Sequence, residues 1–314
     1  MLMSQPARPL AICLMGPTAS GKSAIALALH DVLPVDIVSV DSSQIYRGMD
    51  IGTAKPTAEE QKRAPHRLID IRDPAESYSA ADFREDALRE MGRIAASGRI
   101  PLLVGGTMFY FRALEYGLSA LPSADADVRR RISEEAARKG WPSLHARLAE
   151  IDPETAARVR PSDPHRIQRA LEIHAVTGQA PSALRRAVPE RAPYRFVKIG
   201  LWPDRRAALH ARMARRFEAM LERGLVGEVE ALYRRGDLDL TRPSMRTVSY
   251  RQVWHYLTGS VDYNQMIQQA IAATRQLAKR QMTWLRRYPD VRFLDCSDDP
   301  PIEAALDNVR RFTC

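Results

Sequence analysis

Cysteine is scarce in this chain of 314 residues, which contains only Cys13, Cys296 and Cys314. No two of them have the spacing of a zinc site or a redox pair, and their odd number argues against a disulfide framework. Long hydrophobic runs are missing as well, so we expect no membrane span. The short apolar stretch near the N-terminus leads directly into a glycine-rich loop, which indicates a buried strand and not a signal peptide. We therefore expect a soluble, cytoplasmic protein.

Acidic residues do not balance basic ones in the second part of the chain. Residues 1–120 carry 13 basic and 14 acidic groups, whereas residues 121–314 carry 34 and 24, out of totals of 47 and 38. The net charge of +9 is therefore the sum of −1 and +10. This asymmetry favours a polyanionic partner for the second part. A generally arginine-rich proteome is the alternative explanation.

Alternating strand and helix patterns in the first third predict an α/β fold, a phosphate-loop (P-loop) parallel sheet core flanked by helices. Compact apolar runs typical of buried parallel strands occupy residues 10–15, 35–41, 65–71 and 100–107. Helical patterns cover 22–33 and 79–98, the second with Ser79 as its N-cap. Ligands of such sheets bind at the carboxyl ends of the strands.

The pattern changes near residue 118. Helical periodicity without a strong strand pattern continues to about residue 179, and a strand-like segment returns at 194–203. We therefore expect a phosphate-loop core at 1–118, an inserted helical domain at 119–190, and a return to the core sheet with C-terminal basic helices at 191–314.

The segment GPTASGKS has the Gly-x-x-x-x-Gly-Lys-Ser pattern of a phosphate-binding loop and lies between a predicted strand and a predicted helix. Backbone N–H groups of such a loop, together with the helix dipole, hold phosphate oxygens. Lys22 offers an ammonium to the terminal phosphate, and Ser23 offers a hydroxyl to Mg²⁺. The full cradle comprises Gly16, Pro17, Thr18, Ala19, Ser20, Gly21, Lys22 and Ser23. A glycine-rich turn without a ligand is the alternative.

Two further polar groups follow predicted strands. Asp41 ends the second strand, where a carboxylate can hold the water shell of Mg²⁺, act as a base or cap a turn. The polar loop at 42–56 suits an extended partner. Gly105 and Gly106 let a ligand approach the backbone closely, with Thr107 directly behind them, although a Gly-Gly pair also suits a plain turn.

The C-terminal third combines basic and aromatic residues. Residues 242–288 hold eight Lys and Arg residues against one acid, Asp262. Basic groups can bind phosphates and aromatic rings can stack on bases, so this segment favours a nucleic acid. We expect Trp254 and Trp284 in the core, and not on a stacking surface. Arg212 and Arg216 lie four residues apart, which places them on one face of a predicted helix.

Taken in order, these motifs resemble those of the tRNA dimethylallyltransferases, also called tRNA isopentenyltransferases. The matching segments extend from about residue 11 to residue 287 and read GPTASGKS, VDSSQIYRGMDIGTAKP, PHRLIDI, YSAADF, LVGGTMFYF, LPSAD, DPHRIQRALE and ATRQLAKRQMTWLR. The resemblance implies transfer of a dimethylallyl group from dimethylallyl diphosphate to N6 of adenosine 37, next to the anticodon of tRNAs, with release of diphosphate.

The resemblance also implies roles for individual residues. Asp41 would take the N6 proton as general base, and Thr107 would donate a hydrogen bond near the bridging oxygen of the leaving group. Lys22 and Arg216 would stabilise the leaving diphosphate, with Arg212 as a further diphosphate ligand. The implied tRNA contacts are Asp41, Ser42, Ser43, Gln44, Thr107, Arg129, His165, Arg166, Ile167, Gln168, Arg169, Arg246, Tyr250, Arg251, Lys279, Arg280, Gln281 and Arg286.

One position departs from the family pattern, since Ser249 stands where the family usually has glycine. If this position needs a positive φ, serine costs about 1 kcal/mol there. We expect Mg²⁺ as the cofactor, bound by Ser23. We expect the tRNA anticodon stem-loop and dimethylallyl diphosphate as partners of a monomer that needs no other protein.

Two alternatives share the phosphate-binding loop. One is a P-loop nucleotide kinase or ATPase, which binds ATP through the same residues. The other is an adenylate isopentenyltransferase that acts on free AMP or ADP, which has little use for a basic second part or a helical insertion.

Overall fold

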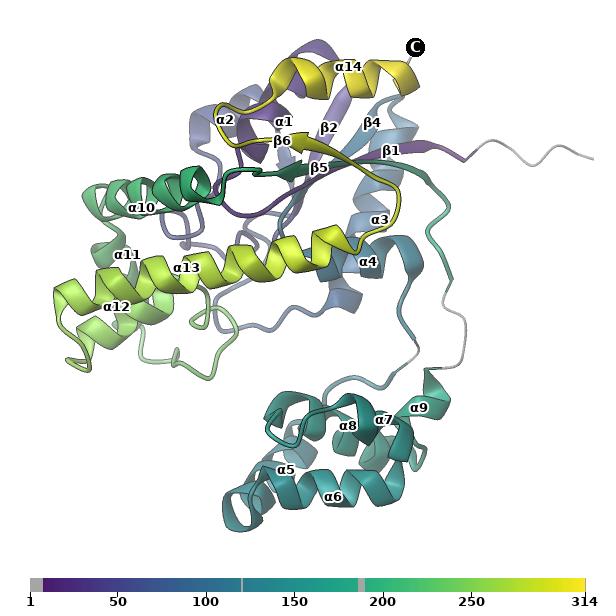
Figure 1. Ribbon diagram of the computed structural model, residues 1–314, viewed down its shortest axis with the longest axis vertical. Coiled ribbons are helices and arrows are strands. Elements are labelled where there is room, and N and C mark those ends of the chain that lie inside the picture. Colours follow the sequence, from purple (N-terminus) through teal and green to yellow (C-terminus); the bar gives the residue numbers. More distant parts are fainter. Residues whose placement is uncertain (1–7, 120, 186–189, 314) are drawn as a thin grey trace, which may run out of the picture. The chain divides into compact units, whose positions relative to one another are not determined.

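The computed structural model describes residues 8–119, 121–185 and 190–313 (Figure 1). Its contacts divide the chain into two compact units, the first made of Met1–Glu115 with Ala192–Cys314 and the second of Tyr116–Arg191. The second unit thus begins three residues before, and ends one residue after, the helical insertion predicted at 119–190. Cys13 and Cys296 are free and buried, and Cys314 lies outside the described residues.

A parallel sheet of six strands forms the centre of the first unit, which confirms the predicted fold class. The strands are β1 (Leu10–Met15), β2 (Val35–Val40), β3 (His66–Arg67), β4 (Ile100–Gly105), β5 (Arg195–Trp202) and β6 (Val291–Asp295). Their order across the sheet is β3-β2-β4-β1-β5-β6, and every neighbouring pair is parallel. The edge strand β6 had no clear signal in the sequence.

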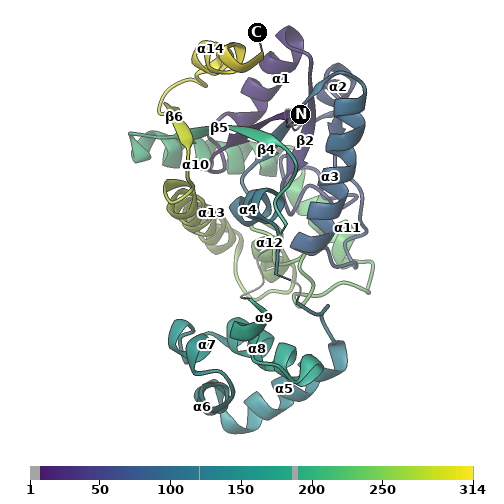
Figure 2. The same ribbon diagram turned by 90° about the vertical axis from the view of Figure 1, so that its right-hand side faces the viewer.

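Helices cover both faces of this sheet (Figure 2). On one face, α1 (Lys22–Val32) and α14 (Ile302–Thr313) pack against Ile12 and Leu14 of β1 in one apolar cluster. Side chains alternate along a strand, so Cys13 and Met15 point to the opposite face. There α3 (Ala80–Ala96) packs against β2 and β4. The chain reverses direction across the sheet between α1 and α3, and right-handed crossovers then place these helices on opposite faces.

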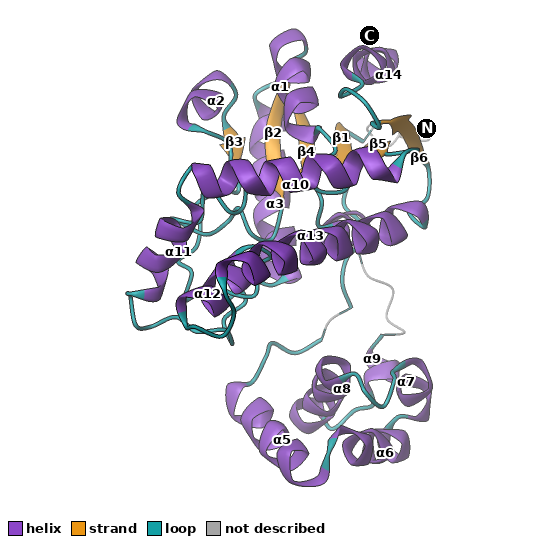
Figure 3. Ribbon diagram, turned by 60° about the vertical axis from the view of Figure 1, so that its left-hand side comes forward, coloured by secondary structure: helices purple, strands orange, loops and turns teal. Residues whose placement is uncertain are grey.

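A second group of helices lies at the carboxyl ends of the strands. It consists of α10 (Arg206–Glu222), α11 (Leu225–Tyr233), α12 (Tyr250–Leu257) and α13 (Tyr263–Arg286). Figure 3 shows α10 and α13 side by side, where Met213 packs with Met282. Ala19, in the loop after β1, and Trp202, which ends β5, pack against the same cluster. These helices therefore build a wall above the strand ends, where ligands of parallel sheets bind.

The other helices of the described residues contain 4 to 14 residues, and local side chains cap several of them. They are α2 (Ala58–Arg63), α4 (Met108–Tyr116), α5 (Ala126–Lys139), α6 (Trp141–Ile151), α7 (Pro153–Arg158), α8 (Pro164–Thr177) and α9 (Pro181–Leu184). Asp125, Asp152 and Asp163 each accept a backbone N–H at the start of α5, α7 and α8, the usual role of an N-cap.

The second unit has its own small core. Leu144, Leu148 and Leu171 are its most buried leucines, and α5, α6, α7 and α8 enclose them. Within the described ranges 8–119, 121–185 and 190–313, we find no helix of sufficient length and hydropathy to cross a bilayer.

The approach of β4 to β2 depends on Gly105. A Cβ atom at this position would lie 2.0 Å from the carbonyl oxygen of Val40. We expect Gly105→Ala to lower the free energy of unfolding by about 1–3 kcal/mol, because the strands must separate to admit the methyl group. Urea denaturation followed by circular dichroism measures the loss.

Gly92 provides the matched control, since it lies inside α3 and a Cβ there meets no atom within 4 Å. Gly92→Ala is expected to stabilise the protein by up to about 1 kcal/mol through helix propensity. Equal stability of Gly105→Ala and the wild-type protein would contradict the close approach.

Candidate active site

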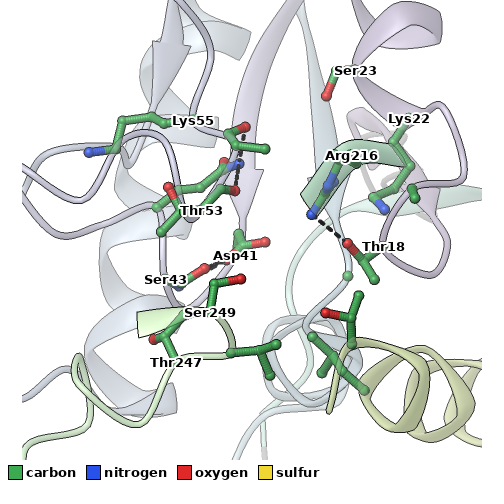
Figure 4. A pocket seen from close by; sticks show the side chains of 18 of the residues that line it. Thr18, Lys22, Ser23, Asp41, Ser43, Thr53, Lys55, Arg216, Thr247 and Ser249 are labelled. Atoms are coloured by element: carbon green, nitrogen blue, oxygen red, sulfur yellow. Dashed lines mark hydrogen bonds between the residues drawn. The ribbon is translucent and has the colours of Figure 1, made fainter. Parts of the chain in front are cut away.

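A cleft of about 940 Å³ lies at the carboxyl ends of β1, β2 and β4, entirely within the first unit. The phosphate loop, the segment after β2, the turn after β4 and residues of α10 and α13 line it. Its volume is that of a small-molecule site. Figure 4 shows Thr18, Lys22 and Arg216 on one side of this cleft, with Asp41 and Ser43 on the other.

The phosphate loop has the conformation of an anion cradle. Ala19 and Gly21 have positive φ angles of 61° and 88°, which turns the backbone toward the first residue of α1. The Nζ atom of Lys22 donates to the carbonyl oxygens of Gly16 and Pro17 at 3.0 and 2.7 Å. The N-terminus of α1 therefore faces the cleft, where its dipole and free N–H groups favour an anion.

Two cations share this wall of the cleft. Burial, reinforced by the nearby Arg216, lowers the pKa of Lys22 to about 8, and Asp41 opposes the shift. Burial also lowers the pKa of the Arg216 guanidinium, again opposed by Asp41. Arg216 Nη2 donates a hydrogen bond to Thr18 Oγ1 at 2.8 Å. The site therefore holds two poorly solvated cations that a bound anion would stabilise.

Asp41 and Thr107 are neighbours because β2 and β4 are paired and both residues follow the strand ends. The Oδ1 atom of Asp41 accepts from the backbone N–H and the hydroxyl of Ser43, at 2.8 and 2.6 Å. Thr107 Oγ1 accepts from the N–H of Ser42 at 3.1 Å. The second carboxylate oxygen of Asp41 has no protein donor among the described contacts, which leaves it available to a substrate.

Most of the residues predicted for the site are brought together in this cleft. Its lining includes Thr18, Ala19, Ser20, Gly21, Lys22, Ser23, Asp41, Ser42, Ser43, Gln44, Thr107, Arg212, Arg216, Arg246, Arg280 and Gln281. The exposed side chains of Arg251, Lys279 and Arg286 belong to the same unit but are not part of the lining.

Arg212 lines the cleft, but its guanidinium is bonded to backbone carbonyl oxygens of the protein. Its guanidinium donates to the carbonyl oxygens of Ala19, Cys296, Ser297 and Asp298 over 2.5–3.1 Å. These contacts hold the phosphate loop against the segment after β6. The expected bond from Arg212 to diphosphate stays a prediction, and the observed contacts indicate a supporting position behind the loop.

Two of the expected tRNA contacts do not fit the structure, because their side chains are buried. Tyr250 is 0% exposed and its hydroxyl donates to Glu228, which together with burial raises its pKa. Ile167 is 0% exposed in the core of the second unit. Both residues lie in segments whose neighbours are polar and exposed, so the linear motif concealed which side chains face inward.

Two other predicted residues of the second unit, Arg129 and Arg169, pair with one buried carboxylate. Glu172 is 0% exposed and accepts from Arg129 Nε at 3.0 Å and from Arg169 Nη1 at 2.8 Å. Gln168 donates to the backbone of Arg129. A buried carboxylate needs such partners, so Arg129 and Arg169 have a structural role in addition to the tRNA contacts predicted for them. The exposed pair at the start of α8 consists of His165 and Arg166.

The expectation for the two tryptophans was half right. Trp254 is buried, at 6% exposure, which confirms the prediction. The prediction was wrong for Trp284, which is 45% exposed and packs edge-to-face against Phe109, itself 48% exposed. Phe109 and Trp284 are 175 residues apart, so no local pattern indicates this exposed aromatic pair.

Ser249 has φ 81°, so this position does adopt the conformation that glycine adopts freely. Its N–H donates to Gln252 Oε1 at 2.9 Å, which starts α12. Ser249 also lines the cleft. The backbone strain therefore lies at the site itself, as strain often does.

Sequence reasoning missed the residues that hold the loop after β2. One carboxylate, that of Glu228, accepts the N–H groups of Asp50, Ile51 and Gly52 at 2.9, 2.8 and 3.1 Å. The buried ammonium of Lys55 lies 2.5 Å from carboxylate oxygens of both Asp50 and Asp70. No local pattern marks Glu228, because its partners precede it by more than 170 residues.

The described residues contain no metal site built from protein side chains alone. In the part of the chain that the structure describes, no three His, Cys, Asp or Glu side chains come together as metal ligands. Ser23, in the first turn of α1, presents its exposed hydroxyl at the cleft. Mg²⁺ often takes only one or two protein ligands and fills its octahedron with phosphate oxygens and water, so this donor set fits Mg²⁺ bound with a diphosphate.

Known proteins share both the sequence and the fold. The family model "IPP transferase" matches residues 44–288. The tRNA dimethylallyltransferase of Burkholderia mallei strain SAVP1 is 58% identical over 303 residues, covering 95% of this chain and 94% of its own. The tRNA isopentenylpyrophosphate transferase of Bacillus halodurans is 38% identical, with TM-score 0.71 over 97% of this chain and 95% of its own.

A eukaryotic dimethylallyltransferase acting on tRNA has the same fold, with TM-score 0.81 at 24% identity over 97% of this chain and 79% of its own. The coverage extends over both units and includes the phosphate loop, Asp41 and Thr107. The chain therefore belongs to the IPP transferase family and is one of its tRNA dimethylallyltransferases.

Proposed function

We propose that this protein transfers the dimethylallyl group of dimethylallyl diphosphate to N6 of adenosine 37, next to the anticodon of tRNAs, and releases diphosphate. One observation carries the proposal: the carboxylate of Asp41 faces the cations Lys22 and Arg216 across a single cleft. A base on one wall and an anion cradle on the other are what this transfer requires. Relatives named for this activity cover the whole cleft.

The nucleophile needs help, because the lone pair of an exocyclic adenine amine is delocalised into the ring. Alignment of N6 with C1 of the donor and removal of its proton overcome this weakness. The N6–C1 bond forms as the C1–O bond breaks, and the electron pair of that bond leaves with the diphosphate. The N6 proton passes to Asp41, whose Oδ1 is fixed by Ser43.

Charge gathers on the diphosphate as it departs. Lys22, Arg216 and the N–H groups of the phosphate loop stabilise that charge from preorganised positions. Thr107 lies at the end of β4 beside Ser42, where its hydroxyl can donate to the bridging oxygen. Mg²⁺, held by Ser23 and diphosphate oxygens, supplies further neutralisation when it is bound.

A tRNA anticodon stem-loop is the acceptor we propose. Arg246 and Arg280 line the cleft, and Lys279 and Arg286 are exposed on α13, so basic groups lie both in the cleft and on the exposed surface of this helix. A base in a structured loop must leave its stack to reach such a cleft. We expect a monomer to be sufficient for this reaction.

The alternatives are less well supported. A nucleotide kinase or ATPase needs no carboxylate opposite its phosphate loop to deprotonate an amine, and relatives covering nearly the full chain carry another name. An adenylate isopentenyltransferase has no use for the basic surface of α13.

The direct test is incubation of the protein with Mg²⁺, dimethylallyl diphosphate and unmodified tRNA, followed by mass analysis of the nucleosides. We expect adenosine carrying one dimethylallyl group, and loss of product when EDTA removes the metal. In one parallel reaction AMP replaces tRNA as the acceptor. In another, ATP replaces dimethylallyl diphosphate. Prenylated AMP, or ATP turnover that does not need tRNA, would support an alternative instead.

Asp41→Asn tests the base. The amide cannot accept the N6 proton, so we expect transfer to slow by about 10²–10⁴-fold. Affinity for inorganic diphosphate is expected to hold or rise, because a negative charge facing the anion has been removed. Single-turnover kinetics and calorimetry measure these two effects. Asp307→Asn on α14 is the control, and transfer within twofold of wild type in Asp41→Asn would refute the assignment.

Lys22 predicts a pH dependence of diphosphate binding. Its pKa in the free protein is lowered to about 8, and only the protonated amine attracts an anion. Affinity for inorganic diphosphate should therefore fall as the pH rises above about 8, by up to about tenfold per pH unit. Calorimetry between pH 7 and 9.5 measures this decline.

Lys22→Arg is the matched control, because an arginine keeps its charge throughout this range. Protonation of diphosphate itself affects both proteins equally, so the ratio of their affinities isolates the lysine. A ratio that does not change with pH would exclude Lys22 as the titrating group.

A further inference from the structure

We propose that Gln281 is a positioning residue for the transfer, which fixes the distance between the diphosphate cradle and the wall that carries the base. The inference rests on the proposed function. The family resemblance implied a tRNA contact for Gln281, which lies on α13 next to the exposed Arg280. Its contacts in the structure point instead into the active site.

The carboxamide of Gln281 uses both of its ends on backbone groups of the cleft. Its Oε1 accepts from the N–H of Thr18 at 2.8 Å. Its Nε2 donates to the carbonyl oxygen of Gly106 at 3.0 Å. The two partners belong to the loops after β1 and β4, which are 263 and 175 residues from Gln281 in sequence. A side-chain amide supplies this acceptor and this donor on two separate atoms.

The turn after β4 is shaped to receive this side chain. A Cβ atom at Gly106 would lie 2.4 Å from Gln281 Nε2 and 3.3 Å from the oxygen of Gly16. Any other residue at 106 would displace the carboxamide. The glycine is thus required by a protein side chain, whereas the sequence suggested only the approach of a ligand.

Each partner of Gln281 is one step from a group with a proposed catalytic role. Thr18 accepts the hydrogen bond of Arg216 through its hydroxyl. Gly106 directly precedes Thr107, whose Oγ1 accepts from Ser42 beside Asp41. Gln281 therefore links the cationic wall to the wall that carries the base, and its two hydrogen bonds set their separation.

The helix that carries Gln281 is firmly held. Ala278, Met282 and Leu285 are buried, and the first two pack against Leu209 and Met213 of α10. Sites supported by rigid elements hold their geometry more accurately than sites on loops. Because Lys279 and Arg280 are exposed on the same turn, α13 offers basic groups to RNA while its inner face aligns the reacting groups.

Gln281→Met tests the proposal, because methionine keeps the size of the side chain and removes both hydrogen bonds. We expect kcat for tRNA prenylation to fall about 10–100-fold, the scale of a misalignment near 1 Å. Affinity for inorganic diphosphate should fall about threefold or more, because the phosphate loop loses the hydrogen bond that holds its backbone at Thr18 in place. The Kd for tRNA and the thermal midpoint should stay within twofold and 2–3 °C of wild type, roughly the range of a surface substitution.

Three further variants sharpen the result. Gln281→Glu keeps the acceptor for Thr18 and loses the donor to Gly106, so it should be impaired as well. Gln276→Met makes the same exchange at an exposed position of α13 and should behave as wild type. Arg280→Ala should show the opposite division, with weaker tRNA binding and a salt dependence shallower by about one unit of slope.

One outcome for Gln281→Met would overturn the proposal, namely a raised Kd for tRNA while kcat and diphosphate affinity stay unchanged. Gln281 would then return to the tRNA contacts. Behaviour equal to that of Gln276→Met in every measurement would overturn it too. Absence of prenyl transfer by the wild-type protein would be a failure of the proposed function alone. Diphosphate affinity would then still decide whether Gln281 orders the cradle.

Discussion

Two half-buried cations on one wall of a cleft, opposite a single carboxylate, are the constraint on which this active site depends. Burial lowers the pKa of both Lys22 and Arg216, Arg216 lowers that of Lys22 further, and Asp41 opposes both shifts. In the free site, Lys22 donates to the carbonyl oxygens of the phosphate loop, and Arg216 donates to the Thr18 hydroxyl. A buried like-charge pair is unfavourable unless compensated, so the free site is already arranged for an anion.

Keeping the opposite wall in place requires contacts from distant parts of the chain. Gly105 lets β4 come against Val40, which brings Thr107 beside the residues after β2. Glu228 then fixes the backbone at 50–52 with three hydrogen bonds. The cleft is therefore a product of tertiary packing across the whole first unit, and the loops that line it would not hold this geometry alone.

The parts of the site that the sequence could predict are those that follow from local geometry. A strand, a glycine-rich loop and a helix in succession predict an anion cradle, and parallel strands bring Asp41 and Thr107 to one edge. The edge strand β6, the clamp formed by Glu228, and the double contact of Gln281 join segments more than 90 residues apart, so no periodicity records them. The burial of Tyr250 was missed for another reason, because exposed polar neighbours in the linear motif concealed that its side chain faces inward toward Glu228.

A phosphate-binding loop can serve this chemistry because it stabilises charge without regard to which atom is attacked. In a kinase the nucleophile approaches phosphorus, so the acceptor must lie within bonding distance of the phosphates themselves. For attack on an allylic carbon, the acceptor lies beyond the diphosphate, and its base must stand farther still from the loop. Asp41 lies on the wall opposite Lys22 (Figure 4), the side from which the proposed acceptor would approach. The loop alone does not distinguish a prenyl donor from a phosphoryl donor, so the proposed assignment depends on the residues that face it across the cleft.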